Sequence, residues 1–93
     1  MATSAAHANR AQASSALLDA FQKTTNAIAE KAGLTERELD VMRLIAKGYS
    51  YQAIADELCI SLSTVQGHTK NVYRKLGVHS KQEVISYVRD STA

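Results

Sequence analysis

The apolar residues after position 33 recur at helical spacing. Leu39, Met42 and Ile45 follow one another at intervals of three, and Ile54 and Leu58 are four residues apart. Such intervals place side chains on one face of a helix, whereas a half-buried strand requires strict alternation, and no segment alternates in that way. The pattern predicts an all-α fold with helices at about 36–47, 51–58, 62–76 and 81–90.

Glycines and small polar residues mark where these helices begin and end. The chain contains no proline, and three of its four glycines each precede an apolar or aromatic residue at a predicted helix end. Glycine adopts the left-handed conformation that closes a helix, and Ser or Thr at a helix start accepts hydrogen bonds from free amides. Two starts also carry the glutamate of a capping box. The expected closing glycines are Gly33, Gly48 and Gly77, the capping boxes are Thr35 with Glu38 and Ser80 with Glu83, and the plain N-caps are Ser50 and Ser61.

The connection between the second and third of these helices is very short. Only Cys59 and Ile60 separate the second helix from the N-cap of the third. The two helices must therefore cross steeply about a tight turn, which is helix-turn-helix geometry. Because no basic residue adjoins Cys59 in sequence, we interpret it as a small buried or half-buried residue rather than a reactive thiol.

The first 33 residues differ in composition, being rich in alanine with Ser, Thr, Gln and Asn. We expect the first dozen to be disordered and a weakly amphipathic helix to run from about Ser14 to Gly33. Three roles are open for the apolar stripe of this helix: packing on the domain, pairing with another copy, or linking to a further part of a longer protein. The expected division is a disordered start and an N-terminal or linker helix over 1–33, followed by a helix-turn-helix domain over 34–93.

The third predicted helix has two contrasting faces on a helical wheel. Val65, Val72 and Leu76 share one face with His68 and Thr69. This apolar side is expected to face the core. The opposite face carries Ser63, Gly67, Lys70 and Arg74, with Gln66 and Asn71 on its flanks.

Charge and one glycine suggest a role for that outer face. No acidic residue lies between Glu57 and Glu83, while that interval holds four lysines and arginines. Gly67 lies at the centre of the face, although glycine inside a helix costs about 1 kcal/mol relative to alanine. A missing side chain there would let the helix backbone approach a partner closely. The alternative is an ordinary solvated face around a tolerated glycine.

Double-stranded DNA is the partner that these residue types fit. Glutamine and lysine hydrogen-bond to adenine and guanine edges in the major groove, and cations and hydroxyls contact phosphates. We predict that Gln66, Gly67 and Lys70 face the bases. The predicted DNA-backbone contacts are Ser50, Tyr51, Thr64, Asn71, Arg74 and Lys75.

Other function classes find little support in the composition. A chain of 93 residues leaves little room for an enclosed catalytic cleft, and no nucleophile with a base, paired carboxylates or phosphate loop is present, so we expect neither an enzyme nor a small-molecule substrate. One cysteine and three histidines offer no disulfide and no metal-ligand spacing, so no cofactor is expected. Without a signal peptide or a membrane-spanning apolar stretch, the expected location is cytoplasmic.

The segment from Leu34 to Val88 resembles the DNA-binding domain of the LuxR family of bacterial transcription regulators, which includes the NarL response regulators and GerE. The matching pieces are "LTERE", "KGYS", "AIADEL", "ISLSTVQGH" and "KLGVHSKQE". The resemblance implies a four-helix domain, here preceded by an additional N-terminal helix, whose third helix enters the major groove and whose fourth often supplies a dimer contact. It further implies a homodimer on DNA. Val84, Tyr87 and Val88 are expected first of all to face the core, and any surplus apolar surface among them, with Ile85, is the expected dimer patch.

Two positions depart from the family's pattern. Gln66 stands where a lysine or arginine is common, and Gly67 lacks a side chain that could read a base, so base readout is expected to rest on Gln66 and Lys70 with help from DNA shape. His68 matches a histidine common in the family and is expected to pack inward.

Several alternatives stay open at this level. The chain could instead be a protein-interaction module acting through its N-terminal or C-terminal helix, or the promoter-reading region of a sigma factor, against which the "KLGV" exit counts. The resemblance also leaves open a missing sensory domain, a contact with RNA polymerase, and a location as the cytoplasmic part of a larger membrane-attached protein.

Overall fold

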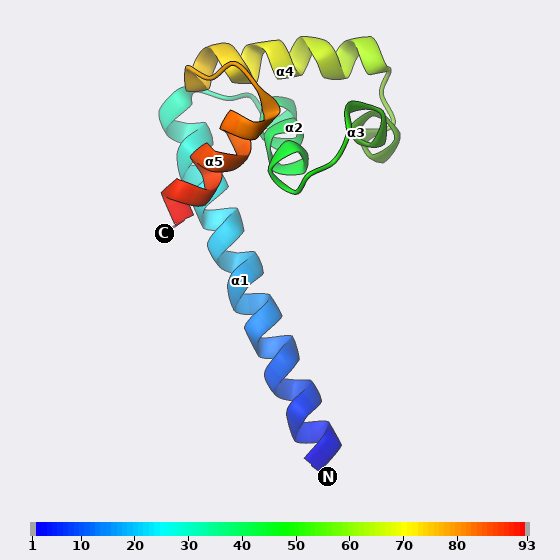
Figure 1. Cartoon of the computed structure of the whole chain (residues 1–93), viewed down its shortest axis with the longest axis vertical. Helices are drawn as coiled ribbons and strands as arrows, with labels where there is room; N and C mark the ends of the chain where they lie inside the picture. The colour runs from blue at the N-terminus through cyan, green and yellow to red at the C-terminus, as the bar shows by residue number, and fades with distance from the viewer. Residues whose placement is uncertain (1, 93) are drawn as a thin grey trace.

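The computed structural model describes the backbone of residues 2–92 and the side chains of residues 16–92. Within that range it is all-helical, with α1 at Ala2–Ala32, α2 at Glu36–Ala46, α3 at Tyr51–Leu58, α4 at Leu62–Leu76 and α5 at Lys81–Thr92. The four helices predicted after residue 33 are confirmed, their ends differing from the expected ones by at most two residues. Figure 1 shows α4 lying across one end of the molecule, with α2, α3 and α5 beneath it and α1 running away from them.

The predicted start and stop residues act as expected, with one shift. Thr35 and Glu38 form a reciprocal capping box, and the hydroxyls of Ser50 and Ser61 cap α3 and α4. The three closing glycines have positive φ angles. At α5 the Ser80 hydroxyl accepts from the Glu83 amide, but the Glu83 carboxylate accepts from the His79 amide at 2.6 Å, one residue before the position a capping box requires.

The core collects the inner faces of all five helices. Its fully buried side chains include Val41, Met42 and Ile45 of α2, Ile54 of α3, Val65 and Val72 of α4, and Val84 of α5. The apolar spacing seen in the sequence therefore corresponds to the buried side of each helix.

The C-terminal third of α1 belongs to this core. Thr25 is fully buried and Ile28 is 6% exposed. Arg43 of α2 donates from Nε to the Thr25 hydroxyl at 2.9 Å and from Nη2 to the Asn26 side-chain oxygen at 2.7 Å. Of the three roles open for α1, packing on the domain is thus realised, and the core crosses the predicted boundary at residue 33.

The backbone of α1 is helical back to Ala2. Disorder of the first dozen residues stays a prediction of the sequence. The absence of proline and glycine before Gly33 and the abundance of alanine favour helix propagation from the anchored end.

The turn between α3 and α4 also holds a correction. Cys59 is exposed rather than buried, and it adopts the left-handed conformation with φ 56°. The amide of Ile60 reaches back to the Ala55 carbonyl at 3.0 Å, which closes α3 in the way that a glycine usually does. The turn is so short that Cys59 must take this conformation despite its side chain, at a cost of about 1 kcal/mol.

Candidate nucleic-acid interface

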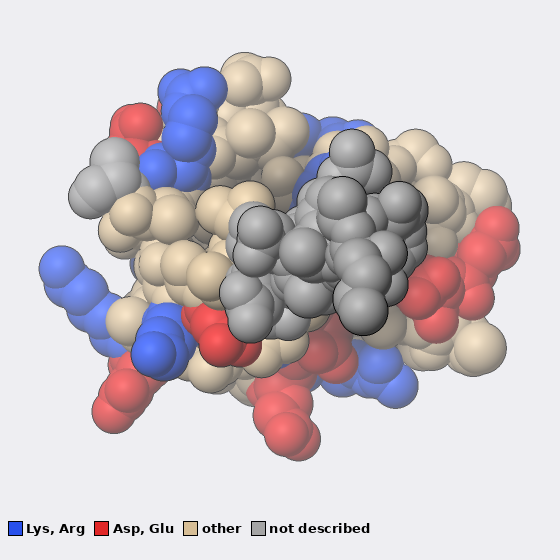
Figure 2. Space-filling model, turned by 90° about the horizontal axis from the view of Figure 1, so that it is seen from below, with Lys and Arg blue, Asp and Glu red and all other residues tan. Residues whose placement is uncertain are grey.

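The outer face of α4 is open to solvent. Gln66, Gly67, Lys70 and Arg74 are all exposed, and Lys70 takes part in none of the ion pairs among residues 16–92. α4 contains no acidic residue. Seen from below in Figure 2, the described residues around α1 carry acidic and basic side chains intermixed. The acid-free face predicted from the sequence is therefore a real surface of the fold.

Gly67 is not required by the packing of this chain. A Cβ added at Gly67 would meet no atom within 4 Å, and the residue has no positive φ angle. The fold itself would accept a side chain at this position. The packing of the described residues therefore gives no reason for a glycine at this position.

A small hollow lies beside this face, where α3 begins. Its volume is about 170 Å³, and Tyr51, Gln66, Thr69, Lys70 and Tyr73 line it. The hydroxyls of Tyr51 and Tyr73 share a hydrogen bond of 2.7 Å. Burial raises the pKa of Tyr73 above its ordinary value and the Tyr51 hydroxyl raises it further, so Tyr73 keeps its proton at neutral pH. One hydroxyl of the pair is left with a hydrogen to donate.

Two features of this hollow were not visible in the sequence. Lys81 of α5 places its Nζ 4.9 Å from the centre of the Tyr51 ring, a cation–π arrangement. The Thr69 hydroxyl is buried and has no hydrogen-bond partner among the described residues. No spacing rule links Lys81 with Tyr51, because they lie thirty residues apart in sequence and meet only through the fold.

The residues predicted to contact the DNA backbone are partly exposed and partly half-buried. Ser50 and Thr64 are exposed at the starts of α3 and α4, and Arg74 is exposed near the end of α4, with only a long contact of 3.4 Å to the half-buried Asn71. Tyr51 is half-buried in the hollow. These residues border the outer face of α4 as expected.

Lys75, the remaining predicted DNA-backbone contact, is bonded within the fold. Its Nζ lies 2.7 Å from the Glu38 carboxylate and 3.0 Å from the Gly33 carbonyl, and the two side chains are 22% and 5% exposed. Burial raises the pKa of Glu38, but the hydrogen bonds from Lys75 and from the Thr35 amide outweigh it, and the net pKa lies below the ordinary value. Lys75 therefore holds α4 to α2 and to the end of α1.

The predicted dimer patch on α5 is smaller than expected. Val84 is fully buried and Val88 is 4% exposed, because both face the core. Only Ile85 and Tyr87 keep partial exposure. Any second copy would therefore meet few apolar atoms on α5 alone.

Comparison with known proteins identifies this arrangement. The family model GerE, described as bacterial regulatory proteins of the luxR family, matches residues 32–88. The chain belongs to the LuxR family. The Oxygen regulatory protein NreC of Staphylococcus aureus strains JH9, JH1 and Mu3 / ATCC 700698 is 41% identical over 66 residues, which cover 71% of this chain. Those residues are 30% of each relative, so the chain spans under a third of their length.

Membership of the LuxR family establishes the general character of the site. The chain carries a helix-turn-helix domain of the DNA-binding LuxR type. The matched segment contains all of α2, α3 and α4, and it ends within α5, whereas almost all of α1 lies outside it.

The remaining chemistry in the described residues is sparse. Among them no three His, Cys, Asp or Glu side chains gather closely enough to hold a metal ion. None of the helices in this range is long and apolar enough to cross a membrane. His68 is half-buried on α4.

Proposed function

We propose that α4 enters the major groove of double-stranded DNA and that Gln66 and Lys70 hydrogen-bond to base edges there. The observation that supports this most strongly is the combination at Gly67: a glycine at the centre of an exposed, acid-free helix face, where the fold leaves open space. A glycine helps such a face because the backbone can then lie closer to the bases.

The residues around that face would contact the phosphates. Ser50, Thr64 and Arg74 are exposed and offer hydroxyl and guanidinium donors, and the Tyr51–Tyr73 pair offers one further hydroxyl hydrogen. Asn71 lies on the flank of the face beside Arg74 and completes this set. Lys75 is left out because its charge is already paired with Glu38.

The domain is proposed to act as a homodimer that reads two half-sites. One helix in the major groove contacts only a few base pairs, so two copies on one duplex lengthen the sequence that is read. Contact with RNA polymerase and attachment to a larger membrane protein stay predictions of the sequence.

The test is selection of bound duplexes from a random-sequence pool by the wild-type chain. The expected result is enrichment of a motif with two half-sites. Selection with Lys70→Ala should then lose preference at one position of each half-site, while the other positions are retained. If no duplex is retained even at low salt, the proposed role of α4 is wrong, and the alternative of a protein-interaction module is favoured.

A further inference from the structure

The hollow beside the outer face of α4 is lined by residues that all carry a polar atom: Tyr51, Gln66, Thr69, Lys70 and Tyr73. Its volume of about 170 Å³ far exceeds the roughly 15 Å³ of free volume that one water molecule requires. Thr69 is 4% exposed, and its buried hydroxyl, which has no partner among the described residues, adds an unpaired polar atom to this lining. The hollow therefore suits a polar occupant larger than one water molecule.

The hydroxyls of Tyr51 and Tyr73 present one free hydrogen to this hollow. They share a hydrogen bond of 2.7 Å, and neither hydroxyl has a second partner among residues 16–92. Two hydroxyls joined by one bond use one hydrogen and keep the other. When Tyr73 donates to Tyr51, the hydrogen that Tyr51 keeps is donated more strongly, because hydrogen bonds in a chain polarise one another. The pair then acts as a single reinforced donor.

Lys81 acts on the same tyrosine from α5. Its Nζ lies 4.9 Å from the centre of the Tyr51 ring, its side chain is half-buried, and it takes part in none of the ion pairs within residues 16–92. The connection after α4 turns back beneath that helix, which brings the start of α5 to this place (Figure 1). A cation over a phenol ring draws π electrons toward itself. Lys81 therefore makes the Tyr51 hydroxyl a stronger donor.

The charges around the hollow favour an anion. Lys70 lines it without a carboxylate partner, and the cation of Lys81 is close by. Glu83 of α5 is the acidic residue whose charge reaches Tyr73. The Glu83 carboxylate already accepts a hydrogen bond of 2.6 Å from the His79 amide at the start of α5. Two unpaired cations therefore stand against one carboxylate that is bonded elsewhere.

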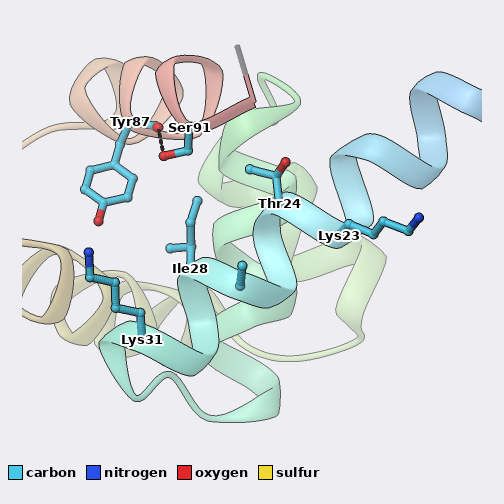
Figure 3. Close-up of a pocket in the computed structure, with 7 residues that line it drawn as sticks. Lys23, Thr24, Ile28, Lys31, Tyr87 and Ser91 are labelled. Atoms are coloured by element: carbon cyan, nitrogen blue, oxygen red, sulfur yellow. Dashed lines mark hydrogen bonds between the residues drawn. The ribbon is translucent and has the colours of Figure 1, made fainter.

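The larger hollow between α1 and α5 offers no such donor. It has a volume of about 400 Å³, and Figure 3 shows Lys31 extending toward Tyr87 while Lys23 points away. The Ser91 hydroxyl donates to the Tyr87 carbonyl at 2.8 Å, so its hydrogen is already used. No hydrogen bond among the described residues links a second hydroxyl to that of Tyr87. A reinforced hydroxyl donor is thus a property of the smaller hollow.

We propose that this hollow is a subsite for one phosphate of the DNA backbone, in which Tyr51 donates to a phosphate oxygen and Tyr73 and Lys81 are positioning residues that strengthen this bond. The subsite rests on the proposed function, in which α4 lies in the major groove. The phosphates of a strand run along the edge of that groove, and Tyr51 begins α3 beside the exposed Ser50 at the edge of the outer face. A hydrogen bond to a charged acceptor is roughly twice as strong as one to a neutral acceptor.

Titration of the duplex selected by the wild-type chain tests the three roles. Tyr51→Phe keeps the ring and should raise the Kd about tenfold. Tyr73→Phe and Lys81→Met should each raise it about threefold, and Lys81→Arg should restore it, because a guanidinium also stacks on the ring. Lys47→Met is the matched control: it removes the same charge from a similar position, 5.4 Å from the centre of the Phe21 ring, and should leave the Kd unchanged.

A double variant and the salt dependence separate a positioning role of Lys81 from a direct phosphate contact. If Lys81 acts through the Tyr51 hydroxyl, Lys81→Met should cause no further loss in a Tyr51→Phe chain. The slope of log Kd against log salt concentration should also stay that of the wild type. A direct contact would instead multiply the two losses and lower the slope by about one phosphate. That result would overturn the assignment of Lys81.

Neutral substitution of single phosphates locates the occupant of the hollow. Each phosphate of the selected half-site is replaced in turn by an uncharged methylphosphonate, and both the wild type and Tyr51→Phe are titrated. At one position the wild type should lose affinity and Tyr51→Phe should lose much less, because it has no hydroxyl to donate there. Urea denaturation confirms that each variant is folded.

Two outcomes would overturn the subsite: a Tyr51→Phe chain that binds like the wild type, or methylphosphonate profiles that are the same for both chains. Either one would leave the proposed role of α4 intact, because the sequence preference of the wild type is measured separately. A wild-type chain that retains no duplex would refute the proposed function and the subsite together.

Discussion

Lys70 and Lys75 lie five residues apart on the same helix and have opposite surroundings. Lys70 stands exposed on the outer face of α4 without a carboxylate partner, whereas Lys75 is largely buried and bonded to Glu38 at 2.7 Å. Along the chain both belong to one acid-free basic interval. A run of basic residues therefore leaves free positive charge only at those positions that the fold leaves unpaired, and for that reason we propose the DNA contact at Lys70 and not at Lys75.

Replacing Lys75 should destabilise the folded domain, whereas replacing Lys70 should not. Lys75→Met leaves the Glu38 carboxylate buried without its cation, so we expect a loss of about 3 kcal/mol in the free energy of unfolding. Urea denaturation measures it. Lys70→Met is the matched control and should change the stability by less than about 0.5 kcal/mol. Equal stability of the two variants would remove the structural role of Lys75.

Lowering the pH should remove the stability contributed by the Glu38–Lys75 ion pair. The folded-state pKa of Glu38 lies below its ordinary value of 4.5, so the carboxylate binds protons less readily in the folded state. Its contribution is complete at pH values above 4.5 and is lost as the pH falls through the folded pKa. Wild-type stability should therefore fall more steeply below pH 4.5 than that of Lys75→Met, measured by urea denaturation at a series of pH values. Parallel curves would contradict the assignment.

A bulky residue at Gly67 should weaken DNA binding without destabilising the fold. Gly67→Leu should leave the fold intact, because the position is open, but weaken DNA binding on the order of a hundredfold, about 2.7 kcal/mol. Gly67→Ala is the control and should raise the stability of the domain by about 0.5 to 1 kcal/mol. The measurements are duplex titration and urea denaturation. Unchanged binding by Gly67→Leu would make the glycine an ordinary surface residue.

Lys70 and Arg74 lie on the same outer face, and their replacement should affect DNA binding in different ways. Lys70→Ala should cost about 1 to 3 kcal/mol on the selected site and relax preference at one base position. Arg74→Ala should instead weaken binding to all sequences similarly and flatten the salt dependence by about one phosphate contact. Titrations of cognate and scrambled duplexes at several salt concentrations separate the two. Identical losses for both variants on every duplex would refute the assigned roles.

The smallest expected effect concerns the turn that orients α4. Cys59→Gly should stabilise the domain by about 1 kcal/mol, because glycine adopts the left-handed conformation without the penalty that the cysteine side chain carries. Cys59→Ala keeps the penalty and should leave the stability near that of the wild type. Urea denaturation under reducing conditions compares them, and a destabilised glycine variant would show that the side chain contributes to the turn.

The sequence alone predicted the four helices after residue 33 and the helix-turn-helix, since the determinants are local: apolar residues at intervals of three and four, a Ser or Thr before each of these four helices, and a glycine after most ends. It also determined the outer face of α4, because a helical wheel follows from helix geometry alone. The left-handed Cys59 escaped prediction, since a non-glycine residue in that conformation is imposed by the length of the turn.

Which of those residues are exposed and unpaired depends on the tertiary structure. The sequence identifies Glu38 as one half of a capping box with Thr35. It does not show the second hydrogen bond of Glu38, from Lys75, because these residues are 37 positions apart. How much apolar surface α5 leaves exposed beside the buried Val84 and Val88 depended on the placement of α5 against its neighbours. Leu17 and Leu18 share the apolar face of Ile28, yet they are exposed because the other helices end before reaching them. Pairing and burial depend on contacts between distant segments, which spacing along the chain does not encode.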